Sequence, residues 1–213
     1  HHLAGEGVPR VRIIQTHTAP NPRRVRIFLA EKGIEVVLQE VDLMAGDLRT
    51  RGFKALNPLQ QVPVLVLDDG TAISESVAIC RYFEELQPDP PLLGVGAMGR
   101  AMVEMWNRRV EMGLFLPVAH AFRHLHPSMS HLEVPQVPAW GAANKPKVLE
   151  FLELLDGRLG GSRYIAGPAL SIADITALVA VDFMRAARIE RPAPLANLAR
   201  WHEEMSGRPS ATA

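Results

Sequence analysis

The chain has 213 residues, of which 47% are hydrophobic and 22% are charged, and its 23 basic residues balance its 23 acidic ones. These shares are typical of a globular protein and exclude a disordered chain, which has less apolar content and an excess of one charge. A formal net charge of zero argues against a protein that binds nucleic acid through a basic surface. The single cysteine, Cys80, has no intrachain disulfide partner, which favours a reducing, cytoplasmic setting.

Strands and helices are expected to alternate after a start that resembles the remnant of a purification tag (residues 1–7). Residues 11–15 and 35–41 are β-branched and apolar, which predicts two strands. Between them, Asn21 stands before a proline, a pair that suits the cap and the first residue of a helix, and Gly33 suits its end.

A second block of elements follows in the same half of the chain. We expect a short helix, a strand, a hairpin turn, a returning strand and a helix, at residues 48–55, 61–67, 68–71, 72–73 and 74–86. The order βαβ followed by ββα is that of a thioredoxin-like domain. We therefore predict such a domain over residues 9–87.

The composition changes at Pro88-Asp89-Pro90-Pro91, which cannot continue a helix and is typical of an interdomain linker. Beyond it the apolar spacing is helical, which predicts an all-helical domain over residues 98–213. Ser171-Ile172-Ala173-Asp174 has the pattern of a capping box and opens an almost wholly apolar helix, so this helix is expected at the centre of the domain. Other helices are expected at residues 100–125, with a bend after Pro117, and at 147–159 and 195–205.

Several short motifs together resemble the cytosolic glutathione transferase family. The matching stretches are Asn57-Pro58-Leu59-Gln60-Gln61-Val62-Pro63-Val64-Leu65, Glu75-Ser76-Val77-Ala78-Ile79, Tyr82-Phe83, Asn21-Pro22-Arg23-Arg24-Val25, Leu29-Ala30-Glu31-Lys32-Gly33, Ile165-Ala166-Gly167 and Ser171-Ile172-Ala173-Asp174-Ile175. Their order and spacing cover residues 11–210. The resemblance implies an α/β thioredoxin-like domain followed by an all-α domain, and a two-fold symmetric homodimer.

The resemblance also implies a set of glutathione-binding residues. In the family the Val-Pro bond is cis, and the backbone before it pairs with the cysteinyl part of glutathione, so Val62 and Pro63 are expected to do so here. Glu75 and Ser76 stand at a helix start, where free N–H groups suit the γ-glutamyl carboxylate. Gln61 is expected to reach toward the glycyl end.

The partner of the glycyl carboxylate stays open between two arginines. Arg49 is the first candidate, since a guanidinium forms charge-assisted hydrogen bonds with a carboxylate, and Arg51 is its rival.

The residue that activates the sulfur is the point at which the chain departs from the family. The family places a Ser, Tyr, Cys or Thr just after the first strand, and this position falls on Ala19 here. Thr18 is the first candidate in its place. Asn21 is the second, since it matches bacterial, disulfide-reductase-like members with a Thr-Pro-Asn sequence, and His17 is the third. A fourth possibility is that backbone N–H groups at the start of the first helix hold the thiolate.

Two functions follow from these residues. The first is a glutathione transferase that activates the thiol of its co-substrate for attack on a small hydrophobic electrophile, or on a disulfide or peroxide, with a role in detoxification. The second is a transferase-like binding or interaction module with little catalysis, which Ala19 favours. No metal is expected, because no carboxylate completes a ligand set around His120 and His124 within their helix. The longest apolar runs are too short to cross a membrane.

Overall fold

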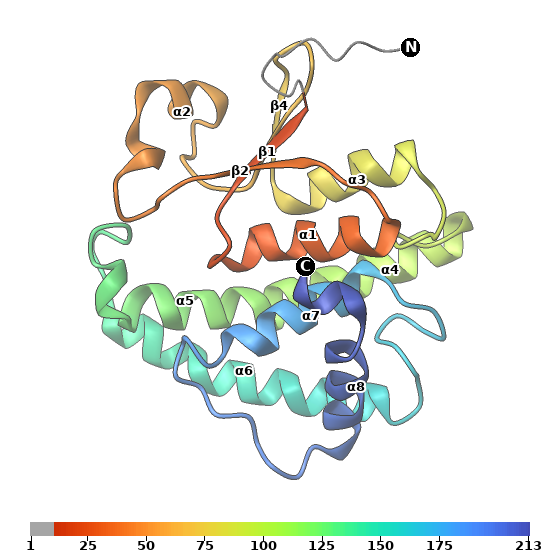
Figure 1. The fold of residues 1–213 in the computed structure, drawn as a ribbon. Helices are drawn as coiled ribbons and strands as arrows, with labels where there is room; N and C mark the ends of the chain where they lie inside the picture. The colour runs from red at the N-terminus through yellow and green to blue at the C-terminus, as the bar shows by residue number, and fades with distance from the viewer. Residues whose placement is uncertain (1–10) are drawn as a thin grey trace. The chain divides into compact units, whose positions relative to one another are not determined.

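A computed structural model describes residues 11–213, so the tag-like start and the first two residues of the predicted first domain lie outside the described part. The described chain divides into two compact units, one up to Pro90 and one from Pro91 to Thr212, with Ala213 assigned to the first unit. Figure 1 shows the strands in the first unit and the long helices in the second. Within residues 11–213, none of the helices is long and apolar enough to span a bilayer.

The first unit is built on a four-stranded sheet with the strand order β2-β1-β3-β4. Its elements are β1 (Arg12–Gln15), α1 (Pro20–Lys32), β2 (Val37–Glu40), α2 (Arg51–Leu56), β3 (Val64–Val66), β4 (Ala72–Ser74) and α3 (Ser76–Leu86). The pair β1–β2 is parallel and is joined through α1, whereas β3 is antiparallel to both β1 and β4. The expected thioredoxin-like order is therefore confirmed.

Side chains alternate along each strand, and the central strands β1 and β3 are buried on both faces, whereas the four residues of β2 are exposed. On one face, Ile14, Val64 and Val66 pack in a buried cluster with Leu48 and with Phe53 of α2. Ile13 and its cross-strand partner Leu65 point to the other face and are fully buried. On that side α1 and α3 lie next to each other (Figure 1).

A buried lysine joins the C-terminal ends of α1 and α3. Lys32 forms an ion pair with Glu84, and its Nζ donates hydrogen bonds to the carbonyl oxygens of Gln87 at 2.8 Å and Pro90 at 2.5 Å. The side chain has no exposed area, so each of its donors must find a partner inside the protein. The expected linker therefore starts at a fixed point of the first unit.

The second unit is helical, as expected. Its helices are α4 (Gly96–Val110), α5 (Leu116–Leu125), α6 (Pro138–Leu159), α7 (Ile172–Phe183) and α8 (Ala196–Ser206). The expected bend after Pro117 is wrong in its place: a π-helical turn at Glu111–Phe115 precedes this proline, which lies in the first turn of α5.

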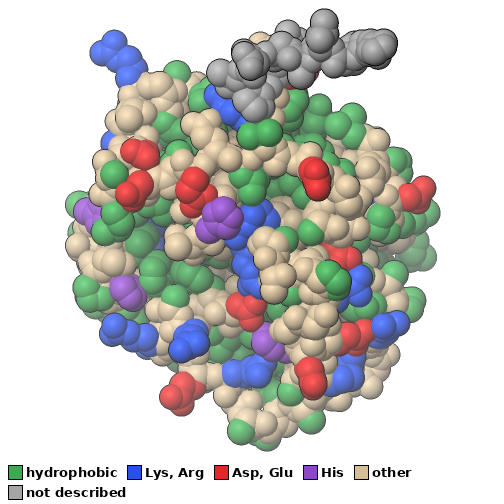
Figure 2. Space-filling model, in the orientation of Figure 1, with side chains coloured by type: hydrophobic (Ala, Val, Ile, Leu, Met, Phe, Trp, Pro, Cys, Tyr) green, Lys and Arg blue, Asp and Glu red, His purple; other side chains and the backbone are tan. Residues whose placement is uncertain are grey.

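The expected start of α6 at residue 147 is also wrong, because the helix begins at Pro138 and runs through Pro146. Its early part packs closely on α5: a Cβ atom at Gly141 would lie 2.7 Å from the Cγ atom of Leu125. Two leucines of these helical stretches are exposed, Leu86 of α3 at 64% and Leu154 of α6 at 50%. On the face drawn in Figure 2, acidic and basic side chains are interspersed.

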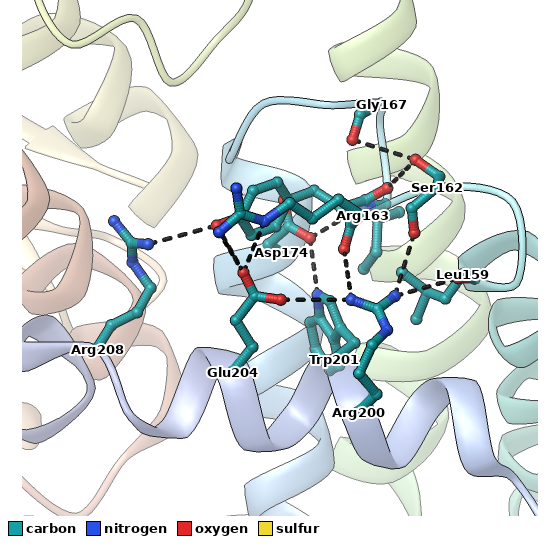
Figure 3. Close-up of polar contacts among 11 residues, drawn as sticks. Leu159, Ser162, Arg163, Gly167, Asp174, Arg200, Trp201, Glu204 and Arg208 are labelled. Carbon is teal, nitrogen blue, oxygen red and sulfur yellow. Dashed lines mark hydrogen bonds and ion pairs between the residues drawn. The ribbon is translucent and has the colours of Figure 1, made fainter.

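Asp174 is the polar centre of the second unit. Ser171 and Asp174 form the expected capping box at the start of α7, in which the carboxylate accepts from the backbone N–H of Ser171. The carboxylate also accepts from the backbone N–H of Ile165 and from Nε1–H of Trp201, each at 2.9 Å (Figure 3). One buried side chain therefore connects α7, α8 and the loop before α7.

We predict that Asp174→Asn lowers the free energy of unfolding at pH 5 by about 2 kcal/mol or more, because the amide cannot accept all three hydrogen bonds. Burial raises the pKa of Asp174 to about 6, against the hydrogen bonds that lower it. A carboxyl whose pKa is raised in the folded state stabilises most when protonated, and this contribution is lost as the pH rises through the folded pKa. The stability gap between wild type and variant should therefore narrow from pH 5 to pH 8 in urea unfolding; a gap that widens would contradict this.

Candidate functional site

A cluster of three side chains joins the N-terminal ends of α1 and α3. Nε of the buried Arg24 donates to Oγ of Ser76 at 3.1 Å, and its Nη2 donates to Oδ1 of Asn21 at 2.9 Å. Oγ of Ser76 in turn donates to the same Asn21 oxygen at 3.1 Å. These contacts hold the start of α3 against the first turn of α1.

The orientation of the Asn21 amide follows from its partner. An arginine side chain has only donors, so the Asn21 atom that faces Arg24 must be the amide oxygen. The amide nitrogen of Asn21 is then directed away from Arg24, with two N–H groups to donate. The expectation that Asn21 caps α1 is wrong: the helix begins at Pro20, Ala19 is its cap residue, and no side chain caps it.

The loop between β1 and α1 is held by a second arginine, Arg26. Its Nη1 donates to Oε1 of Gln15 at 2.5 Å and to the carbonyl of Thr16 at 3.4 Å, and its Nη2 donates to the carbonyl of His17 at 3.3 Å. His17 turns away to β2, where its backbone N–H and its Nδ1 each lie 2.8 Å from the carboxylate of Glu40. His17 is therefore already engaged elsewhere.

Thr18 lies in this fixed loop with an exposed side chain, and its Oγ1 is 3.4 Å from Oγ1 of Thr16. The backbone of the helix start offers few donors beside it. Pro20 and Pro22 have no N–H, so only Asn21 contributes one among the first three residues of α1. If backbone groups alone held the thiolate at the start of α1, very few N–H groups would be available to do so.

Glu75 and Ser76 stand at the start of α3, as expected. Glu75 is exposed and has a φ angle of 71°, which is uncommon for a residue with a side chain and costs about 1–3 kcal/mol. Its carbonyl accepts the first hydrogen bond of the helix, from the N–H of Ile79 at 3.0 Å. The first N–H groups of α3 have no partner within the helix and can therefore bind an anion.

Val62 and Pro63 precede β3, and the bond between them is cis, as expected. Two side chains that sequence reasoning missed shape this segment: Nδ2 of Asn57 donates to the carbonyl of Gln61 at 2.9 Å, and Nε2 of Gln60 donates to the carbonyl of Leu48 at 3.0 Å. Among residues 11–213, no backbone hydrogen bond to Val62 occurs, so its N–H and C=O can pair with an extended ligand.

Gln61, Arg49 and Arg51 have exposed side chains, and within the described residues none of the three forms a side-chain hydrogen bond. These observations do not distinguish Arg49 from Arg51. Cys80 is fully buried, and burial raises the pKa of its thiol to about 12, so it behaves as a small apolar residue. Residues 11–213 contain no group of three or more metal-ligating side chains arranged around a common point.

This geometry defines a thioredoxin-like domain followed by a helical domain. The comparisons with known proteins identify the class. The profile of the glutathione S-transferase N-terminal domain matches residues 18–86, and that of the C-terminal domain matches residues 119–209. The chain is 35% identical over 201 residues to glutathione S-transferase 2 of Saccharomyces cerevisiae, covering 93% of this chain and 86% of that protein.

Solved structures agree with the sequence comparison. A glutathione S-transferase domain-containing protein of Marinobacter aquaeolei superposes with a TM-score of 0.91 at 39% identity, covering 93% of this chain and 98% of that one. Gtt2 from Saccharomyces cerevisiae superposes with a TM-score of 0.90 at 34% identity, covering 94% of this chain and 98% of that one. The chain belongs to the glutathione S-transferase family.

We predict that Arg24→Met weakens glutathione binding at least tenfold, measured by calorimetry, because Ser76 and Asn21 lose the charged donor that orients them. The lost hydrogen bonds to a charged group should also lower the free energy of unfolding by about 2–3 kcal/mol. Arg81→Met is the matched control, since it removes an exposed arginine from α3 of the same unit and should leave the affinity unchanged. Equal affinities of Arg24→Met and wild type would contradict the role given to Arg24.

Proposed function

We propose that the protein is a glutathione transferase in which the first unit binds glutathione and the second supplies an apolar pocket for an electrophile. The observation that carries the proposal is a combination of two features in the first unit. Among the described residues, the backbone N–H and C=O of Val62 have no hydrogen-bond partner, and α3 begins at Ser76. A peptide-like ligand with a carboxylate at one end fits these two features together. The chain is similar over most of its length to transferases, and this similarity favours catalysis over a binding module without catalysis.

In the proposed complex the γ-glutamyl carboxylate accepts from the N–H groups that open α3, and Glu75 lies beside the ligand's ammonium group. The hydroxyl of Ser76 donates to Asn21 in the unliganded geometry, so it must rotate before it can donate to the ligand. The cysteinyl backbone pairs with Val62 beside Pro63. Gln61 and Arg49, or Arg51 in its place, receive the glycyl end.

The sulfur then lies near the start of α1, where two side chains are candidates to hold the thiolate. Thr18 offers a hydroxyl in the fixed loop. Asn21 offers the amide N–H groups that Arg24 directs away from itself. A hydrogen bond to the thiolate favours the charged form and lowers the thiol pKa, which raises the fraction of nucleophile at neutral pH.

The thiolate attacks either an electrophilic carbon, which gives a conjugate, or a disulfide or peroxide, which is reduced. We place the enzyme in the cytoplasm as a homodimer with a role in detoxification. The buried, unpaired Cys80 is consistent with that compartment. The exposed apolar side chains of Leu86, Val95 and Met98 offer surface that a second copy would cover.

We predict that Glu75→Ala combined with Ser76→Ala weakens glutathione binding at least tenfold, which corresponds to about 1.4 kcal/mol. The physical reason is the loss of the polar groups that accompany the helix start. Glu85→Ala, an exposed change on the same helix, is the control. If calorimetry gave the folded double variant the affinity of wild type, the proposed site would be excluded.

The two candidates for the sulfur are separated by an ultraviolet titration of bound glutathione. If Thr18 holds the thiolate, Thr18→Ala should raise the thiol pKa and Thr18→Ser should retain much of the effect; each pKa unit corresponds to about 1.36 kcal/mol. If Asn21 holds it, Asn21→Ala should give the larger rise and Thr18→Ala should titrate like wild type. If the thiol pKa shifted in neither alanine variant, neither Thr18 nor Asn21 would hold the thiolate.

A further inference from the structure

A groove of about 530 Å³ lies in the second unit and takes no part in the proposed transferase site. It is formed at the C-terminal end of α7, the first residues of the long blue connection to α8 in Figure 1, and one residue of α8. The lining residues are Val181, Asp182, Met184, Arg185, Arg188, Ile189, Glu190, Arg191 and His202. The apolar members Val181, Met184 and Ile189 are buried and form the floor.

Three arginines line this groove without protein partners. Within residues 11–213, none of the side chains of Arg185, Arg188 and Arg191 forms a hydrogen bond or an ion pair, and all three are exposed. Elsewhere the guanidinium groups of Arg163 and Arg200 bind Glu204. Each free guanidinium has five N–H donors, so the groove concentrates donors and positive charge that the protein itself does not use.

The carboxylates and carbonyls beside these arginines have other partners. Oδ1 of Asp182 lies 2.7 Å from Nε2 of His202. The carbonyl of Met184 accepts from the N–H of Ile189 at 2.9 Å, and the carbonyl of Arg185 accepts from the N–H of Arg188 at 3.1 Å. The lining holds two carboxylates, Asp182 and Glu190, and with His202 neutral they offset two of the three guanidinium charges.

Arg188 occupies a backbone position that favours glycine. The two backbone hydrogen bonds close the helix end as a Schellman motif, with Arg188 at its left-handed residue and a φ angle of 57°. A side chain at this position costs stability relative to glycine. An arginine therefore lines the groove at a position where backbone conformation disfavours it, and such an outlier points toward a function.

We propose that this groove binds a small organic phosphate that carries two or more negative charges, such as a diphosphate ester. Guanidinium groups bind phosphate oxygens through pairs of parallel N–H donors, and the three arginines of the lining outnumber its two carboxylates. The buried apolar floor gives the carbon part of the ligand a surface to contact. The site is separate from the glutathione-binding residues proposed above, and its occupation does not depend on them.

The test is calorimetric titration of the full chain with inorganic pyrophosphate, with ADP, and with uncharged adenosine. We expect pyrophosphate and ADP to bind, ADP at least as tightly, with affinities that fall as salt is added, and adenosine not to bind. Arg185→Gln combined with Arg188→Gln should weaken the binding of pyrophosphate at least tenfold. Arg108→Gln is the matched control, since Arg108 is an exposed arginine of α4, 3.8 Å from Glu104, and this change should leave the affinity unchanged.

Arg188→Gly serves as a second variant that should fold at least as well as wild type, because glycine suits the φ angle of this residue. We expect an unchanged or higher Tm together with weaker pyrophosphate binding. Because these variants change only residues of the groove, comparing them with wild type distinguishes binding in the groove from any anion binding in the first unit. The proposal is overturned if wild type gives no heat with millimolar pyrophosphate, if adenosine binds as well as ADP, or if either arginine variant binds pyrophosphate like wild type.

Discussion

The guanidinium of Arg24 is the constraint on which the candidate site depends. It is buried and has only donors, so Oδ1 of Asn21 and Oγ of Ser76 must present acceptors to it. One side chain thereby orients the Asn21 amide and holds the start of α3 near the start of α1, through a contact between Arg24 and Ser76, which are 52 residues apart along the chain. A ligand that contacts both helix starts meets groups that are already oriented.

The order of elements could be predicted from the sequence because its signals are local. Alternating apolar strands, the Asp69-Gly70 turn and the capping box at Ser171 each need only a few neighbouring residues. The two misplaced helix starts have different causes, one local and one in the packing of helices. Asn21 is a good cap by type, but the proline before it starts the helix and Arg24 takes its oxygen. The early turns of α6 lack an apolar stripe and form because Gly141 allows close packing on α5.

The residues of the candidate site also fall into those that the sequence predicts and those that only the fold shows. Val62-Pro63 and Glu75-Ser76 could be predicted as site residues because they stand in short motifs that resemble the glutathione transferase family. Arg24 and Arg26 were missed as supporting residues, because a basic side chain in a helix is normally solvated and only the fold shows these two to be buried. Because Ala19 stands at the family's hydroxyl position, the sulfur contact stays a proposal with two candidates, the hydroxyl of Thr18 and the side-chain amide of Asn21.

A crystal structure of the protein with bound glutathione tests the central claim most directly. The account predicts the γ-glutamyl carboxylate at the backbone N–H of Ser76, the cysteinyl backbone paired with Val62, and the sulfur within about 3.5 Å of the Asn21 amide nitrogen or of Oγ1 of Thr18. Glutathione bound away from the starts of α1 and α3, or a sulfur distant from both side chains, would contradict it.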